Sequence, residues 1–245
     1  MTNSIEVINL SKTYKSKKAV SNINFKINEN EIIGLLGPNG CGKTTTIGMI
    51  LGLLKPTSGK VFINGLDIEK NKISILHKMN FISPYIELPK KLTVRQNLIV
   101  YGKLYNIQNL DDQIKYLSNK LRLDVLLDKI TGELSSGQKN RVSLAKALIN
   151  NPTVLLLDEP TASLDPETGD FIRTFLENYK KEKKISLLLA SHNMDEVKRL
   201  CSSVLMMKDG TIVDSGSPDD LIKKYGRKNL EEVFLELVRN KNEFN

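Results

Sequence analysis

The sequence predicts an α/β fold in which a mostly parallel sheet carries an N-terminal antiparallel β layer and an inserted helical lobe. Three observations favour it. Residues 5–36 alternate between apolar and polar side chains, as half-buried strands do. Short apolar runs at 32–36 and 154–157 are typical of strands buried on both faces of a parallel sheet. Residues 93–132 instead follow a helical pattern.

The elements of the N-terminal half follow from local patterns. Val61–Gly65 continues the strands of 5–36 and completes the antiparallel layer. Thr45–Leu54, directly after the buried run at 32–36, is expected to be a helix. Met79–Ser83 is expected to be a further strand.

Capping signals mark the helices that follow. Thr93 with Gln96 forms a capping box, and Asp111 is the expected cap of a second helix in the same lobe. Lys139–Asn150 has apolar side chains at helical spacing. Ile185–Ser191 is expected to be a strand, within a return to strand–helix alternation.

The C-terminal tail is expected to be helical. Ser217 with Pro218 predicts a helix start, because proline is favoured at the first helical position. A final helix has an apolar stripe that we expect to pack on the same chain's core, formed by Leu230, Val233, Phe234, Leu237 and Val238.

Composition narrows the classes of function. The 245 residues suit one sizeable domain, expected to span 1–245 with the helical lobe at about 84–150 and the tail at 217–245. The net charge of +8 comes from lysines spread along the chain, and only 6% of residues are aromatic, so no nucleic-acid partner is expected. No run is as long as a membrane span and no signal peptide is evident, so a cytoplasmic location is expected.

A glycine-rich octet after the strand at 32–36 has the pattern of a phosphate-binding loop. It consists of Gly37, Pro38, Asn39, Gly40, Cys41, Gly42, Lys43 and Thr44. The backbone of such a loop points N–H groups at phosphates, Lys43 can reach the β- and γ-phosphates, and the Thr44 hydroxyl can ligate Mg²⁺. The octet predicts binding of ATP or GTP. A helix N-terminus and Lys43 also favour a reactive Cys41 thiolate, with a shielded thiol as the alternative.

Two further stretches offer polar groups at strand and helix ends. Asp158 and Glu159 follow the apolar run at 154–157, so Asp158 can hold a metal and Glu159 can activate a water, although a solvated turn would look the same. Ser135, Gly137 and Gln138 open a helix whose N-terminus can bind an anion, and a plain capped helix is the alternative.

Along the chain, these motifs occur in the order of the phosphate loop, the Ser135–Gln138 helix start, Asp158–Glu159, Ser163-Leu164-Asp165 and a histidine after a strand. This ordered set resembles the nucleotide-binding domain of ATP-binding cassette (ABC) proteins. The resemblance covers Ile5 to Val238 and implies a P-loop NTPase core. It implies that Tyr14 stacks on adenine, unless it is an ordinary exposed tyrosine, and that Thr45 also lines the nucleotide. It also implies that His192 contacts the γ-phosphate.

The resemblance further implies a head-to-tail dimer around two ATPs, in which Ser135, Gly137, Gln138 and Asp165 serve the partner's nucleotide. Single-domain exporter subunits are the most similar type, so we expect an ATPase that drives a separate membrane-spanning permease from the inner face of the cell membrane. The dimer is either a homodimer or a heterodimer. The alternatives are a soluble ABC ATPase acting on ribosomes or DNA and a regulatory module with weak turnover.

The chain departs from the family pattern at Pro84, where the family has a Mg²⁺-ligating glutamine. Proline offers no side-chain ligand. Because Mg²⁺ keeps water in several coordination positions, an active ATPase with altered coupling is expected rather than an inactive one.

Overall fold

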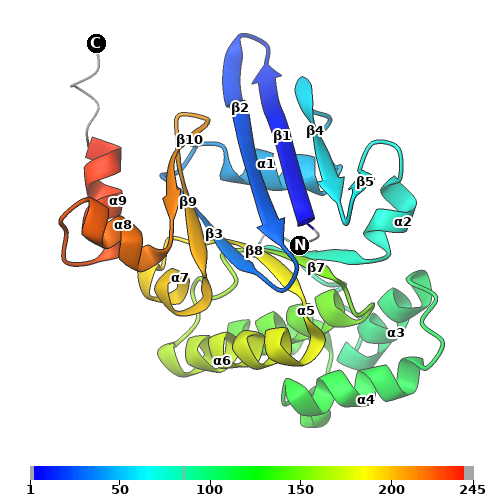
Figure 1. The fold of residues 1–245 in the computed structure, drawn as a ribbon. Helices are drawn as coiled ribbons and strands as arrows, with labels where there is room; N and C mark the ends of the chain where they lie inside the picture. Colours follow the sequence, from blue (N-terminus) through cyan, green and yellow to red (C-terminus); the bar gives the residue numbers. More distant parts are fainter. Residues whose placement is uncertain (1–2, 85, 240–245) are drawn as a thin grey trace. The chain divides into compact units, whose positions relative to one another are not determined.

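The computed structural model describes residues 3–84 and 86–239. They form two compact units, one built from the residues up to Leu76 together with those from Ser186 onward, and one continuous from His77 to Ile185 (Figure 1). Both mix strands and helices, which confirms the α/β class. No helix within the described ranges is long and apolar enough to cross a bilayer.

The first unit contains the predicted antiparallel layer. Its strands lie in the order β2-β1-β4-β5, and every neighbouring pair is antiparallel. They span β1 (Asn3–Tyr14), β2 (Lys17–Asn28), β4 (Ser58–Ile63) and β5 (Leu66–Asp67). Ile5, Val7 and Leu10 of β1 are buried, so the apolar side of the alternating pattern faces a core.

The same unit contains the first buried strand and its parallel neighbours. β3 (Ile32–Leu36) pairs in parallel with β8 (Ser186–Ala190) on one side and with β9 (Ser203–Lys208) on the other. β10 (Thr211–Gly216) adds to β9 as an antiparallel edge. All residues of β3 and β8 are buried, as their apolar runs predict.

The helices of the first unit are α1 (Lys43–Ile50), α2 (Lys72–Leu76), α7 (Met194–Leu200), α8 (Pro218–Lys224) and α9 (Leu230–Arg239). Ser217 caps α8 as predicted. The prediction of Thr45–Leu54 placed α1 too late. The helix begins directly after Gly42, whose left-handed φ of 113° ends the loop, and Gly52 with φ of 64° turns the chain away soon after Ile50.

The second unit packs helices around a parallel strand pair. The strands are β6 (Met79–Ile82) and β7 (Val154–Asp158). The helices are α3 (Val94–Leu104), α4 (Leu110–Lys120), α5 (Ser136–Leu148) and α6 (Pro166–Lys183), with short 3-10 turns at Asp124–Leu126 and Thr131–Glu133.

One of the predicted caps in this unit is wrong. The Thr93–Gln96 capping box is present, with the Thr93 hydroxyl oxygen accepting from the Gln96 N–H at 3.1 Å. Asp111, however, lies inside the first turn of α4, which begins after Asn109. An acidic side chain in that turn interacts favourably with the helix dipole, which explains the residue without a capping role.

Candidate functional site

The phosphate loop curls around its own lysine. Lys43 Nζ donates hydrogen bonds of 2.6 Å to the Gly37 carbonyl oxygen and 3.1 Å to the Pro38 carbonyl oxygen. The Cys41 N–H also donates to the Pro38 carbonyl oxygen, at 3.2 Å. The loop therefore places a cationic group inside its own curve.

Two glycines allow this curve because other chain segments approach their backbone closely. A Cβ atom at Gly37 would lie 2.3 Å from the Met207 carbonyl oxygen, and one at Gly42 would lie 2.5 Å from the Ala19 carbonyl oxygen. Asn39, Gly40 and Thr44 are exposed on the open side of the loop. The first N–H groups of α1 have no partner within the helix. These N–H donors, together with Lys43, suit the phosphate groups of a nucleoside triphosphate.

The Cys41 thiol is shielded, so the prediction of a reactive thiolate is wrong. Cys41 is only 3% exposed. Burial raises the pKa of its thiol above the ordinary value, and the nearby Lys43 charge offsets this only in part. The carbonyl oxygen of Cys41 accepts from the Gly210 N–H at 3.0 Å, so the residue anchors the loop from behind.

Tyr14 lies at the end of β1, in a hairpin whose second strand passes the phosphate loop. It pairs with Lys17 at the start of β2, and Ala19 of that strand is the residue that contacts Gly42. The ring is 45% exposed and Lys12 Nζ lies 5.1 Å from its centroid. The ring is thus partly exposed on the first unit, with a lysine ammonium group over it.

His192 reaches the same sheet edge as the phosphate loop. β3 and β8 are parallel, with Leu35 opposite Ala190, so Gly37 and His192 both follow the carboxyl ends of neighbouring strands. The His192 side chain is exposed. An edge of this kind is where open α/β sheets bind ligands.

A buried network on both sides of His192 was missed by the sequence analysis. The Ser191 hydroxyl donates to Glu196 Oε2 at 2.6 Å, and Ser191 Oγ accepts from the Asn193 N–H at 3.1 Å. Asn193 Oδ1 in turn accepts from the Glu196 N–H at 3.0 Å and caps α7. The spacing Asn193-x-x-Glu196 could have indicated this network, because a capping residue followed three residues later by a glutamate is typical of a helix start.

In the second unit, Asp158 and Glu159 stand at the carboxyl end of β7 as predicted. Asp158 is 5% exposed. Glu159 has a left-handed φ of 51°, which is uncommon for this residue type and occurs often at functional sites. Asn140 Nδ2 of α5 donates to the carbonyl oxygen of Pro160 at 2.7 Å, fixing the turn that carries the two carboxylates.

The starts of α5 and α6 lie against each other. Ser135 caps α5 through a capping box with Gln138, in agreement with the predicted helix start at these residues. A Cβ atom at Gly137 would lie 3.1 Å from the Thr168 side chain in the first turn of α6. Asp165 caps α6 by accepting from the Thr168 N–H at 2.9 Å, and hydrogen bonds from Thr168 hold the pKa of the Asp165 carboxyl below its usual value. Two exposed helix N-termini thus adjoin.

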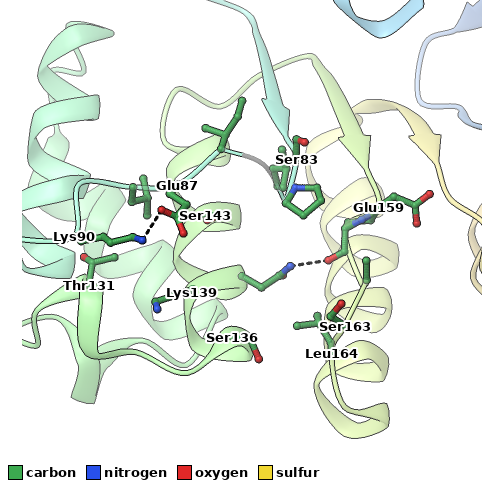
Figure 2. A pocket seen from close by; sticks show the side chains of 17 residues that line it. Ser83, Glu87, Lys90, Thr131, Ser136, Lys139, Ser143, Glu159, Ser163 and Leu164 are labelled. Atoms are coloured by element: carbon green, nitrogen blue, oxygen red, sulfur yellow. Dashed lines mark hydrogen bonds and ion pairs between the residues drawn. The ribbon is translucent and has the colours of Figure 1, made fainter. Parts of the chain in front are cut away.

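A cavity of about 250 Å³ in the second unit joins several of these segments. It is lined by Pro84 and Glu87 from the segment after β6, by Ser136 at the start of α5, and by Glu159 and Leu164 from the turn after β7. Figure 2 shows the Glu87–Lys90 ion pair on one side and the Glu159 carboxylate pointing away from α5. Pro84 therefore lies beside the carboxylate turn, although it brings no ligand.

Oxygen donors suitable for Mg²⁺ are present in both units. Thr44 offers an exposed hydroxyl in the first turn of α1, and Asp158 offers a carboxylate at the end of β7. Among the described residues, no three or more His, Cys, Asp or Glu side chains group together as a metal site. Each donor by itself suits a hard cation that takes most of its ligands from water and phosphate.

Comparison with known proteins agrees with this geometry. Residues 20–162 match the family model described as ABC transporter. The bacitracin transport ATP-binding protein BcrA of Bacillus licheniformis is 37% identical over 94% of this chain and 75% of its own length. The choline transport ATP-binding protein OpuBA of Bacillus subtilis is 35% identical over 91% of the chain and 60% of its own length. The Nod factor export ATP-binding protein I of Rhizobium etli is 35% identical over 89% of this chain and 69% of its own length.

Solved structures give the same result. The structure of an ATP-binding subunit of an ABC transporter superposes with a TM-score of 0.87 at 27% identity, covering 95% of this chain and 98% of its own. A dimeric ATP-binding cassette in a post-hydrolysis state, bound to ADP and Pi, gives a TM-score of 0.79 at 26% identity. The match covers 87% of this chain and 98% of that structure's chain.

Proposed function

The chain belongs to the ABC transporter family, as an ATP-binding ATPase subunit, and we propose that it works on a transporter of the export type. The observation that carries ATP binding is the Lys43 ammonium held inside a glycine loop. Export is supported by the Nod factor export relative, whereas the name of the choline transport relative gives no direction. The two units would act together as one ATP-binding domain over residues 1–245.

In the proposed reaction, the loop N–H groups and Lys43 bind the β- and γ-phosphates and Tyr14 stacks on the adenine. Glu159 accepts the proton of the attacking water, and His192 stabilises the γ-phosphate. Thr44 and Asp158 would hold Mg²⁺, which as a Lewis acid offsets charge on the phosphate oxygens. Most of the rate acceleration would then come from holding the water and the phosphates in the reactive geometry and from the fixed charges around them.

The proposed working unit is a dimer attached to a separate permease at the inner face of the cell membrane. The adjoining starts of α5 and α6 support this, because Ser135 and Asp165 are exposed there, with Gln138 half-buried and Gly137 buried against Thr168 between the two helices. This pair of helix starts would bind the γ-phosphate of the ATP held by a partner subunit. A regulatory module with weak turnover is the second candidate, and Pro84 is the observation that favours it.

Purified protein tests the proposal directly. We expect Mg²⁺-dependent release of phosphate from ATP, and ATP-dependent dimerisation seen by light scattering. Tight ATP binding without turnover, with or without Mg²⁺, would support the regulatory module instead. To test transport, the chain is co-expressed with a multi-spanning protein encoded next to it. ATP-driven uptake of substrate into inside-out vesicles indicates export, and uptake into right-side-out vesicles would overturn it.

A further inference from the structure

The C-terminal helix α9 packs on the first unit close to the phosphate loop. Leu230 and Val233 are 2% and 0% exposed and Phe234 and Leu237 are half-buried, so this part of the predicted stripe packs on the same chain's core, whereas the side chain of Val238 lies outside the described residues. Figure 1 shows α9 beside the β9–β10 hairpin. The function proposed above gives this helix no role.

The helix and the loop face each other across a small void. Its lining includes Gly37 and Pro38 of the loop, Phe234 and Leu237 of α9, and Met207 at the end of β9. The void measures about 10 Å³, at or below the space that one water molecule needs. The space is therefore too small for a ligand, and the Phe234 side chain lines it together with the Gly37–Pro38 segment.

A hydrogen bond ties the end of α9 to the same strand. Lys208 Nζ donates to the Leu237 carbonyl oxygen at 2.6 Å. Carbonyl groups in the last turn of a helix lack partners within the helix, so a lysine is a suitable donor to them. Two residues further on, the Gly210 N–H donates to the Cys41 carbonyl oxygen. The strand end thus contacts both α9 and the loop.

We propose that Phe234 and Lys208 are positioning residues that hold the Gly37–Pro38 segment in its ATP-binding shape, so that the C-terminal helix sets the affinity for ATP. The inference rests on ATP binding by this chain and is independent of transport direction. A preorganised loop binds more tightly because it loses less conformational freedom on binding. Removing the ring should loosen the loop without touching the groups that react.

The test uses the full chain with Cys201→Ala, so that Cys41 is the only thiol. Phe234→Ala and Lys208→Met are compared with Leu221→Ala, which removes a buried side chain of α8 that does not line the space between α9 and the loop. We measure the dissociation constant of a fluorescent ATP analogue, KM and kcat for ATP, and the rate of Cys41 labelling. In both test variants, affinity should weaken and KM should rise by about fivefold, with kcat within about twofold. Cys41 should label at least about tenfold faster, because its shield is loosened.

Leu221→Ala should lower the melting temperature but leave ATP affinity and the rate of Cys41 labelling unchanged. Phe234→Leu, unlike Phe234→Ala, should keep the ATP affinity and the labelling rate of the parent protein. Equal effects of Leu221→Ala and Phe234→Ala would show general destabilisation and overturn the inference, as would a loss confined to kcat. Lys208→Met and Phe234→Leu keep the test valid if Phe234→Ala fails to fold. Absence of ATP binding by the parent protein would instead contradict the ATPase assignment.

Discussion

The Lys43 ammonium group lies 2.6 Å from the carbonyl oxygen of Gly37, six residues earlier in the same loop. In the proposed ATP complex, a phosphate oxygen would replace this carbonyl oxygen as the partner of Lys43. The loop keeps its curve through this internal contact, and binding a nucleotide exchanges one oxygen partner for another. The charge is in place before the ligand arrives, which reduces the reorganisation that binding requires.

Lys43→Ala should weaken ATP binding by about 10- to 100-fold, because a hydrogen bond to a charged group contributes about 1.5–3 kcal/mol. Lys72→Ala is the matched control. Lys72 Nζ also donates to a backbone carbonyl, that of Gly52 at 2.6 Å, but in an exposed position. Isothermal titration with ATP measures both. Equal losses in the two variants would contradict the role of Lys43.

Glu159→Gln should lower hydrolysis by about 10²- to 10⁴-fold, the usual contribution of a general base, while ATP binding is retained. The variant should accumulate as an ATP-bound dimer, because closure precedes chemistry. Glu69→Gln, at an exposed position, is the control. Unchanged turnover in Glu159→Gln would remove this residue from the reaction, and a monomer at saturating ATP would argue against the dimer.

Ser135→Ala removes the N-cap of α5 and should cost about 1 kcal/mol of unfolding free energy. Thr93→Ala removes the matching capping box of α3 and should cost about the same. Only Ser135→Ala should also reduce hydrolysis, since only that helix start is proposed to bind a nucleotide. Urea unfolding and phosphate release distinguish the two effects, and equal activities would leave Ser135 a purely structural cap.

Pro84→Gln should lower the Mg²⁺ concentration for half-maximal hydrolysis by at least about twofold, because it restores an oxygen ligand beside Glu159. Pro89→Gln changes the same segment at another exposed position and should have no such effect. From the sequence, Tyr85 or Leu88 of the same segment could also fill a groove on the permease; Tyr85 lies outside the described residues, and Leu88 is buried. Unchanged Mg²⁺ dependence in Pro84→Gln would show that this position does not reach the metal.

The buried Cys41 thiol should make stability fall at alkaline pH. Burial raises the pKa of this thiol in the folded state, so the contribution is fully present below the ordinary thiol pKa and is lost as pH rises through the raised value. The slope cannot exceed about 1.4 kcal/mol per pH unit for one proton. Urea unfolding from about pH 7 to 10 should show the decline in the wild type but a smaller one in Cys41→Ala. Parallel curves would contradict it.

Motifs and buried strands could be predicted because their signals are local. The apolar runs of β3, β7 and β8 occur without interruption in the sequence, and the glycine loop has a fixed spacing. The early start of α1 was harder to predict, because it depends on the left-handed backbone of Gly42 rather than on side-chain pattern.

Properties set by distant segments could not be predicted. The shielding of Cys41 depends on the turn after β9, far along the chain, and a local view of Lys43 and a helix N-terminus gave the wrong reactivity. The buried Glu196 network likewise depends on how α7 packs after β8. In both cases tertiary contacts decide the behaviour of a residue whose neighbours in sequence suggest something else.

The placement of β3 between β8 and β9 has a consequence for synthesis of the chain. A ribosome releases β3 and the phosphate loop long before the two strands that pair with β3, whereas His77–Ile185 leaves as one continuous unit. That second unit can therefore fold first, and the first unit must wait for its late strands because non-local pairings form slowly. Until Met207 and Gly210 emerge, the loop lacks the contacts these two residues make with Gly37 and Cys41, so nascent chains should retain ATP less well than the finished chain.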